Sequence, residues 1–477
     1  MMAMGEKKMF LGGRMKRLRR ELGLTQTRMA EDLGVSPSYL NHLERNQRPV
    51  TAQVLLRLAE TYDLDMRAFS GDADATGAAD LNEALADPIF RDLAIPRHEI
   101  TDLAENAPAT AEALVRLYRA YADARRRQAA GIAPEVSEEH SAALSPTDWV
   151  RDYIQAHRNH FPDLDLLGEQ IATELGVPVH GFETAAAQRL LQKAGVQVRV
   201  MPLAVMGDWV RRYDPHRRRL MLSETLGASS RAFSVVYQLA LAEGGDLLNA
   251  LVEAAAPPDL PARRLLKVSL TNYLAAAIIM PYGPFQEAAE QSEYDVALLK
   301  ARFGASFEQV CHRLTTLSRP GARGVPFFLM RVDCAGNVSK RFASETFPFS
   351  RFGGACPRWN IHACFQSPGR ILTQVIETMD GERYFTFART VRRPVAAYSD
   401  TGDSGLALGL GCELKHAGRL VYARGRDLEG GGATQVGPVC RLCERPSCRE
   451  RAAPPATRTV VVEEWTKTVS PYPFSAH

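Results

Sequence analysis

The sequence predicts a chain of several domains, mainly α-helical in its N-terminal part and mixed α+β in the remainder. Three observations predict this class. A chain of 477 residues is too long for one ordinary hydrophobic core, so three or four folded units are expected. Apolar residues recur with helical periodicity up to about residue 130, and short alternating segments with turn residues begin near residue 196. The expected domains span residues 1–70, 71–145, 146–290 and 291–477.

The overall composition is that of an ordinary globular protein. Lys and Arg total 58 against 55 Asp and Glu, a formal charge of +3, and 45% of the residues are hydrophobic. This composition excludes disordered, collagen-like and disulfide-scaffold proteins. The longest apolar run, Leu274–Met280, is far shorter than the roughly 20 residues of a membrane-spanning helix, and no secretion signal is predicted at the start. We therefore expect a cytoplasmic protein with reduced cysteines.

Positive charge is concentrated in the first 50 residues. They contain ten Lys or Arg and five Asp or Glu, a balance of +5 that suggests a polyanionic partner. Four short amphipathic helices are predicted within residues 12–62. Thr25 is a suitable N-cap for the second helix, Ser36 followed by Pro37 for the third, and Gly34 in the intervening turn accepts positive φ. This is helix-turn-helix spacing, in which the third helix lies in the DNA major groove.

The segment LRRELGLTQTRMAEDLGVSPSYLNHLERNQRPV resembles the Xre/Cro-type helix-turn-helix family through its whole motif. The resemblance implies core positions at Leu33, Val35 and Leu40. Side chains early on the third helix can reach bases or phosphates, and those that begin the preceding helix can bind phosphate together with the helix N-terminus. The alternative is a helical bundle with a basic, solvated face. The predicted DNA-binding residues are Gln26, Thr27, Ser36, Ser38, Tyr39, His42, Arg45 and Arg48.

A linker and a helical segment are expected after the helix-turn-helix. The Gly/Asp/Ala stretch Ser70–Asp80 is typical of a linker, and helical periodicity then places Leu114, Leu117 and Tyr118 on one face. One DNA reader contacts too few phosphates for useful specificity, so we expect a homodimer or a higher even oligomer. The segment Leu81–Arg127 is the expected place of that contact.

The helix expected over Arg231–Leu241, followed by the segment SLTNYLAAAIIMP, resembles the ImmA/IrrE-type metallopeptidase domain. That family carries a His-Glu-x-x-His helix and a third zinc ligand on the later segment. Here Tyr237 and Leu241 stand at the two His positions, Gln238 at the general base and Leu270 at the third ligand. These side chains cannot form a catalytic zinc site, so we expect a degenerate domain, no catalytic residues and no enzyme. The apolar cleft left behind could accept an acyl chain, or its residues could fill the core.

A further resemblance is carried by four segments of the last third: SFEQVCHRLTTLSRPGARGVPFFLMRVDCAGNVSKRF, FGGACPRWNIHACF, GCELKHAGRLVYA and GPVCRLCERPSCRERAAPP. With the two preceding domains, they resemble the short-chain fatty acyl transcriptional regulators over nearly the whole chain. The resemblance implies an acyl-coenzyme A effector, with propionyl-CoA expected first, bound near the junction of the middle domain and an α+β C-terminal domain. It also implies control of propionate, methylcitrate or glyoxylate-cycle genes.

Coenzyme A carries phosphates and an adenine ring, so arginine, lysine and aromatic side chains are candidates for its site. At the acyl end, Tyr273 could donate to the thioester carbonyl. A second group of arginines lies on the hairpin expected around Asp214, where a solvated face or a DNA-backbone contact is the alternative; these are Arg211, Arg212, Arg217, Arg218 and Arg219. The predicted ligand-binding residues are Tyr237, Tyr273, Ser339, Lys340, Arg341, Arg351 and Trp359.

All eight cysteines follow residue 310, and three of them, Cys440, Cys443 and Cys448, lie within nine residues of one another. This spacing suits metal ligation in a cytoplasmic protein. Three thiolates do not close a tetrahedral site, so a fourth ligand is needed, with Cys412 as first choice and Cys356 as second. Zinc and a [4Fe–4S] cluster are both compatible, and the family resemblance favours the cluster. The alternative is a redox-sensing or merely buried thiol trio, and the remaining cysteines, Cys311, Cys334 and Cys364, are expected to be core thiols.

The resulting hypothesis is a transcriptional regulator whose operator binding responds to a short-chain acyl-CoA. Two other classes are retained as alternatives. One is a DNA-tethered regulatory metallopeptidase, which would need metal-binding side chains that the sequence lacks at its expected positions. The other is a transcription factor that senses iron or oxidants through its cysteine cluster.

Overall fold

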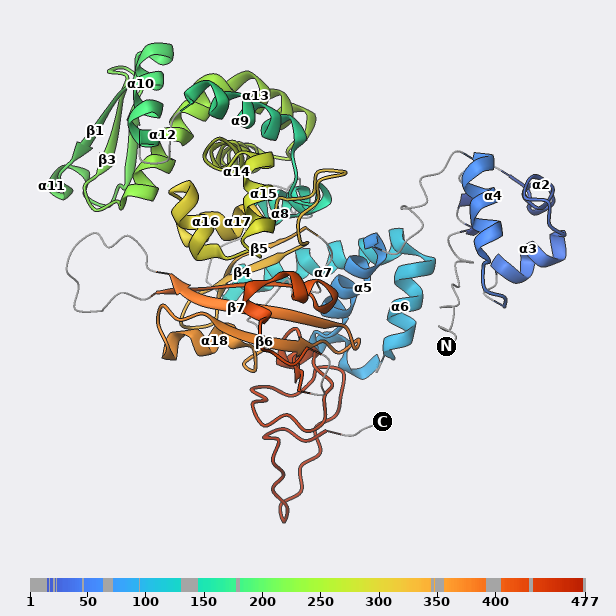
Figure 1. Ribbon diagram of the computed structural model, residues 1–477. Coiled ribbons are helices and arrows are strands. Elements are labelled where there is room, and N and C mark those ends of the chain that lie inside the picture. The colour runs from blue at the N-terminus through green and yellow to red at the C-terminus, as the bar shows by residue number, and fades with distance from the viewer. Residues whose placement is uncertain are drawn as a thin grey trace. The chain divides into compact units, whose positions relative to one another are not determined.

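The computed structural model describes residues 15–16, 18–19, 22, 24–44, 47–62, 72–93, 95–129, 145–176, 181–344, 347, 356–391, 405–428 and 432–474 (Figure 1). The chain divides into an N-terminal unit, Met1–Ala142, and a C-terminal unit, Ala143–His477. Helices make up the described part of the N-terminal unit, while the C-terminal unit contains two sheets as well as helices, which confirms the predicted fold class.

The helix-turn-helix consists of α2 (Gln26–Asp32) and α3 (Pro37–Glu44), followed by α4 (Ala52–Tyr62). Thr25 caps α2, because its hydroxyl accepts a hydrogen bond from the N–H of Arg28 at 3.2 Å. Ser36 accepts from the N–H of Tyr39 at 3.1 Å, and Gly34 has a φ of +62° in the turn. The predicted caps and turn are therefore confirmed. The core of this motif contains Met15, Met29, Ala30, Leu33, Leu40, Leu43, Val50, Val54, Leu55 and Leu58, with Val35 packed against it.

A small bundle follows, made of α5 (Asp72–Leu85), the 3₁₀-helix η2 (Pro88–Leu93), α6 (Arg97–Asn106) and α7 (Pro108–Ala129). The prediction of a linker through Asp80 is wrong from Asp72 onward, because the alanines of this stretch favour helix. The prediction that Leu117 shares the packed face is also wrong, since it is 69% exposed. The packed face contains Leu81, Ala84, Ile100, Ala104, Ala111 and Val115.

The C-terminal unit begins with α8 (Pro146–Ala156), α9 (Pro162–Leu175) and α10 (Phe182–Ala194). A three-stranded sheet follows, in the order β1 (Gln197–Met201), β3 (Arg219–Ser223), β2 (Arg211–Asp214), with α11 (Leu203–Met206) between β1 and β2 in the chain. Strand β3 pairs parallel with β1 and antiparallel with β2, so the predicted hairpin is confirmed. Helices α10 and α12 (Ala228–Glu243) lie on one side of this sheet (Figure 1).

Five more helices complete the middle of the chain: α13 (Gly245–Ala254), α14 (Leu260–Ile279), α15 (Tyr282–Gln291), α16 (Val296–Phe303) and α17 (Phe307–Leu314). Helix α14 packs against α9 and α12 and is buried along most of its second half. None of the described helices could cross a membrane alone by length and apolar character, although α14 and α15 would pass that test together as a bent pair.

A six-stranded sheet follows with the order β5-β4-β8-β7-β6-β9. Its strands are β4 (Phe328–Val332), β5 (Val338–Ala343), β6 (Leu372–Glu377), β7 (Arg383–Val391), β8 (Leu406–Glu413) and β9 (Thr434–Gln435). The short helices are α18 (Asn360–Ala363), η4 (Cys364–Gln366), η5 (Leu414–Arg419), η6 (Val421–Ala423) and η7 (Cys440–Leu442). The turns expected after Val332 and at Asp380-Gly381 join β4 to β5 and β6 to β7.

Alternate residues of the six-stranded sheet enter two different cores. Leu329, Phe385 and Leu410 join the core formed by the helices of the middle domain. Phe328 and Tyr384 join a second core with Trp359 on the other face. The first core is one cluster whose members come from both sides of the boundary predicted between residues 290 and 291, from Val150 to Ala423. That boundary therefore does not separate two independent cores.

Candidate DNA reader, effector pocket and thiol cluster

The predicted DNA-reading side chains lie mostly at the surface of the helix-turn-helix. Thr27, Ser36, Ser38, His42 and Arg48 are exposed, as a reader requires. The guanidinium of Arg48 lies 5.8 Å from the ring centre of Tyr39, which brings together a cation and an aromatic ring at one edge of the motif. Arg45 lies outside the described residues.

Gln26 has a role inside the motif that the sequence did not indicate. Its side-chain amide donates to Glu44 at 3.1 Å, and Arg19 donates to the same carboxylate at 2.6 Å. The carboxylate of Glu44 is nearly inaccessible and so ties α2 to the end of α3. This holds the reading helix in place, so the prediction of Gln26 as a phosphate contact competes with a structural role.

The positions that would hold zinc in a metallopeptidase are occupied by core side chains. Leu270 is fully buried in the main core, and Tyr237 is 6% exposed with the guanidinium of Arg211 at 3.7 Å from its ring centre. Gln238 is also buried, and Leu241 packs against the same core. Two interpretations were open, an apolar cleft that accepts an acyl chain and side chains that fill the core. The structure favours the second.

Tyr273 cannot donate to an acyl group as predicted, because its hydroxyl is enclosed by protein. It donates to Asp165 at 2.8 Å and accepts from the N–H of Phe161 at 3.2 Å. Asp165 and Arg313 form an ion pair at 2.7 Å, with both side chains completely buried. Burial alone would raise the pKa of Asp165, but Arg313, His160 and Tyr273 together lower it below its ordinary value. Tyr273 therefore belongs to a buried polar network.

The ligand residues predicted on the β4–β5 hairpin already have partners. Ser339 accepts from Arg331 at 2.9 Å, and Lys340 forms an ion pair with Glu308 at 2.9 Å. Arg341 on β5 lies in register with Met330 on β4, and Arg351 lies outside the described residues. The structure thus does not bring this basic segment together with Tyr237 and Tyr273, which lie in the helical core.

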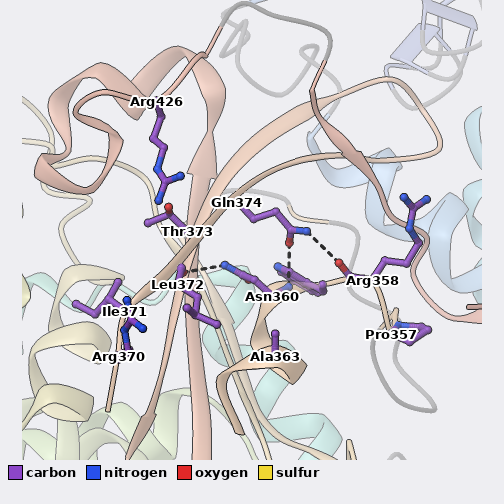
Figure 2. Close-up of a pocket in the computed structure, with 11 residues that line it drawn as sticks. Pro357, Arg358, Asn360, Ala363, Arg370, Ile371, Leu372, Thr373, Gln374 and Arg426 are labelled. Atoms are coloured by element: carbon purple, nitrogen blue, oxygen red, sulfur yellow. Dashed lines mark hydrogen bonds between the residues drawn. The ribbon is translucent and has the colours of Figure 1, made fainter. Parts of the chain in front are cut away.

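Trp359 does border a pocket, of about 410 Å³, between the start of α18 and strand β6. Arginines 358, 370 and 426 surround it, and Arg426 points toward Thr373 in Figure 2. The hydroxyl oxygen of Thr373 is buried without a hydrogen-bond partner among the described residues. The lining consists of Pro357, Arg358, Trp359, Asn360, Ala363, Arg370, Ile371, Leu372, Thr373, Gln374 and Arg426.

Hydrogen bonds hold the polar lining of this pocket in place. The side chain of Gln374 accepts from the N–H of Asn360 at 2.9 Å and donates to the carbonyl of Arg358 at 3.0 Å (Figure 2). Asn360 in turn donates to the carbonyl of Leu372 at 2.9 Å. Of the pocket-lining residues, the sequence predicts only Trp359 as a ligand residue, although Arg358 precedes it directly in the quoted segment.

Of the three pocket arginines, Arg358 lies near a carboxylate, whereas Arg370 and Arg426 have no carboxylate partner among the described residues. The guanidinium of Arg358 lies 3.6 Å from a carboxylate oxygen of Glu450. Arg370 and Arg426 are exposed and form no ion pair within the part of the chain that the structure describes. The pocket therefore offers two unneutralised guanidinium groups and one shared one to an anionic ligand.

The cysteine-rich segment lies close to Cys356. Burial raises the pKa of Cys356, and the neighbouring thiols of Cys443 and Cys440 raise it as well. A Cβ atom on Gly437 would lie 2.8 Å from the sulfur of Cys443, so this glycine leaves room for the thiol. The sulfur of Cys448 instead lies 4.0 Å from Glu450. Within the described ranges, no three His, Cys, Asp or Glu side chains are arranged to hold a metal ion.

Two predictions about individual cysteines need correction. Cys412 was the first choice for a fourth ligand, but it points into the helix-covered core, whereas Cys356 joins the core on the other face of the sheet. Side chains alternate along β8, so Cys412 lies on the helix-covered face together with Leu408 and Leu410. Cys334 is exposed in the β4–β5 turn and is not a core thiol, while Cys311 and Cys364 are buried as predicted.

Comparisons with known proteins agree with this architecture. Residues 316–472 match the family described as short-chain fatty acyl coenzyme A regulator, C-terminal. Residues 191–315 match the IrrE N-terminal-like domain, and residues 15–69 match a helix-turn-helix family. Over 467 residues the chain is 39% identical to the propionyl-CoA carboxylase regulator of Cereibacter sphaeroides, which covers 98% of both chains. The chain belongs to the short-chain fatty acyl-CoA regulator family.

Other members of this family are similar over nearly their whole length. The chain is 39% identical to the HTH-type transcriptional regulator RamB of Mycobacterium tuberculosis over 471 residues, 98% of each chain. It is 38% identical to the HTH-type transcriptional regulator PrpR of the same organism over 467 residues, 97% of this chain and 95% of the other. A solved structure of a Mycobacterium tuberculosis transcriptional regulator has a TM-score of 0.66 at 38% identity and covers 69% of this chain and 99% of its own. The predicted family is therefore confirmed, and this member is a DNA-binding transcriptional regulator.

Proposed function

We propose that the protein is a cytoplasmic, dimeric regulator of short-chain fatty acid genes whose operator binding responds to a short-chain acyl-CoA. Propionyl-CoA is the first effector to test, because a relative with 39% identity is named a propionyl-CoA carboxylase regulator. The observation that carries the proposal is the pocket beside Trp359, which presents Arg358, Arg370 and Arg426 to one cavity.

The chemistry of this pocket suits the nucleotide end of coenzyme A. Guanidinium groups bind phosphates through paired N–H donors, and Arg370 and Arg426 are free of carboxylates among the described residues. The buried hydroxyl of Thr373 and the amide of Gln374 add polar groups for the ligand. A cavity of about 410 Å³ holds part of the effector, and the rest extends through its open side.

Calorimetric titration of the full-length protein with propionyl-CoA tests this proposal. The double variant R370A/R426A should bind at least about tenfold more weakly, a loss of about 1.4 kcal/mol. The matched control R264A/R302A removes two exposed arginines on α14 and α16 and should bind as the wild type does. If the wild type does not bind propionyl-CoA at all, the proposal that it is the effector is wrong.

The response of DNA binding needs its own measurement. The protein would first select its target from a pool of random duplexes, and affinity for the selected duplex would then be measured with and without saturating propionyl-CoA. We expect affinity to change with the wild type and to stay constant with R370A/R426A. Equal shifts in both proteins would show that the effector acts at another site.

The second part of the proposal is a metal at the thiol cluster, most simply an iron–sulfur cluster, with zinc as the alternative. The closeness of Cys356 to Cys440 and Cys443 supports it, because thiolates bind both groups. The backbone N–H of Ala452 donates to the sulfur of Cys440 at 3.4 Å, which fixes the position of this sulfur in the segment. Cys448 would complete the set after turning from Glu450.

Iron and zinc analysis of anaerobically purified protein distinguishes these groups. C356S should lose the metal, whereas C412S, on the opposite face of the sheet, should retain it. Retention by both variants would exclude Cys356 as a ligand. If C443S still binds DNA and its DNA binding still responds to acyl-CoA, the metal is structural and the iron- or redox-sensing alternative is wrong.

A peptidase is not proposed for this chain. The positions required for zinc hold apolar or aromatic side chains, buried at Tyr237 and Leu270 and partly buried at Leu241, and the two leucines have no donor atom at all.

A further inference from the structure

The three-stranded sheet of the C-terminal unit has one covered and one open face. Leu220 and Leu222 of the central strand point into the core beneath α10 and α12. Arg219 and Met221 alternate with them and face the other side. In register with Met221 lie Arg199 on β1 and Arg212 on β2, so two arginines flank a methionine across the sheet.

We call this surface the arginine face; it comprises Arg199, Arg212, Arg219 and Met221, with Trp209 beside it. The guanidinium of Arg212 lies 4.4 Å from the ring centre of Trp209, and Trp209 is 55% exposed. Arg199 and Arg212 lie on strands two places apart, a separation of about 10 Å between their backbones. An aromatic ring and three cations thus share one small, solvent-accessible surface.

The arginine face is not neutralised by its surroundings. Arg199, Arg212 and Arg219 form no ion pair with any carboxylate of the described residues. Asp214, on the same face, accepts hydrogen bonds from the backbone N–H groups of His216 and Arg217 at 3.0 and 3.1 Å. Those donors hold its carboxylate at the turn.

Two other arginines of the same domain do have carboxylate partners. Arg189 bonds Glu243 at 2.6 Å, and Arg231 lies 3.5 Å from a carboxylate oxygen of Glu183. The contrast indicates that the arginine face is built to meet an anion from outside the chain, because unpaired cations gathered on one surface attract a polyanion.

We propose that the arginine face binds the phosphate backbone of duplex DNA beside the site held by the helix-turn-helix. This rests on the DNA-binding part of the proposed function and adds a second, sequence-independent contact to it. A duplex carries about one charge per 1.7 Å of its axis, so about six phosphates fall within the 10 Å that the two flanking arginines span. When the helix-turn-helix binds its site, the flanking duplex is held at a high local concentration near the rest of the same chain.

The test compares two duplexes that carry the selected target site. One is about 20 base pairs long, the span of two half-sites one helical turn apart, and the other has about 20 more base pairs of flank. The wild type should bind the longer duplex more tightly and with a steeper dependence on salt. Charge reversal in R199E/R212E/R219E should remove this gain and lower the slope of log affinity against log salt by about 3, since each lost phosphate contact contributes about 0.9.

A matched control reverses three exposed arginines away from this surface, R264E/R302E/R323E, and should keep the gain from the flank. The lysine variant R199K/R212K/R219K retains the charges and should bind the longer duplex within about threefold of the wild type. Near-ultraviolet circular dichroism would establish that each variant is folded.

Three outcomes would overturn the inference. One is the same slope and the same flank gain in the charge-reversed variant and in the control. Another is a loss confined to single-stranded RNA with duplex DNA unaffected. In the third, the wild type binds neither duplex, which would refute the DNA reader itself and this inference with it.

Discussion

Two regions of the C-terminal unit use arginine in opposite ways. In the interior, Arg313 is completely buried and forms a 2.7 Å ion pair with Asp165, while its Nε donates to the carbonyl of Met280 at 3.0 Å. On the arginine face, Arg199 and Arg212 are exposed and have no carboxylate partner among the described residues. A buried cation must be paired to be tolerated, whereas an exposed unpaired one costs the fold little and remains free to bind a ligand. The partner of an arginine therefore separates a structural role from a binding role.

The largest effect that this comparison predicts is from D165A. Removal of the carboxylate leaves Arg313 buried without its counter-charge, which should cost about 3–5 kcal/mol of unfolding free energy. All four tryptophans lie in the C-terminal unit, so urea unfolding followed by tryptophan fluorescence reports on this unit.

An exposed ion pair provides the matched control. Arg263 and Glu253 form a pair at the surface, and E253A should cost far less than D165A, because water screens an exposed ion pair. Replacement of both buried partners, D165L/R313M, should recover much of the loss, since an apolar pair needs no counter-charge. Equal losses from D165A and E253A would contradict the distinction between buried and exposed charges.

Local features of the sequence predicted local structure well. The caps Thr25 and Ser36 and the turn at Gly34 depend on neighbours in the chain, so their roles were readable from a few residues. The same holds for the β2–β3 hairpin around Asp214.

The features that depend on distant residues could not be read in this way. The sequence predicts Tyr273 as a ligand residue because nothing in its own segment shows that its hydroxyl donates a hydrogen bond to Asp165. The pocket arginines come from three separate segments, and only the fold brings them together. The sequence predicts Cys412 as the fourth ligand ahead of Cys356, and only the fold shows that Cys412 enters the helix-covered core while Cys356 enters the core on the other face of the sheet.

A smaller effect is expected from pH, through the interior. His312 on α17 packs edge-on against Phe342, with ring centres 4.4 Å apart. Burial, helped by the charge of Lys340, lowers the pKa of His312 to about 3 from its ordinary 6.5, although Glu308 acts in the opposite direction. Arg313 and Arg331 lower it further.

The folded pKa of His312 is below the unfolded one, so the unfolded state binds more protons once the pH falls below 6.5. Stability from this residue is complete above pH 6.5 and decreases toward pH 3. Between pH 7 and pH 5 the wild type should lose up to about 2 kcal/mol more than H312Q, at about 1.4 kcal/mol per pH unit below 6.5. H216Q, which changes an exposed histidine of the β2–β3 turn, should follow the wild type. Parallel curves for the wild type and H312Q would show that the ring titrates normally in the fold.

The smallest effect belongs to the arginine face, and it decides whether the comparison holds. R199A removes an exposed side chain without an ion pair in the described chain, so the unfolding free energy should change by less than about 0.5 kcal/mol. The same variant should weaken binding to flanked duplex DNA and reduce the salt slope by about 0.9. A loss of 1 kcal/mol or more in stability would mean that Arg199 packs into the fold as Arg313 does. We expect a stable protein with weakened DNA binding. Removal of a cation without an internal partner costs the fold little, but it removes a contact to the polyanion that the cation binds.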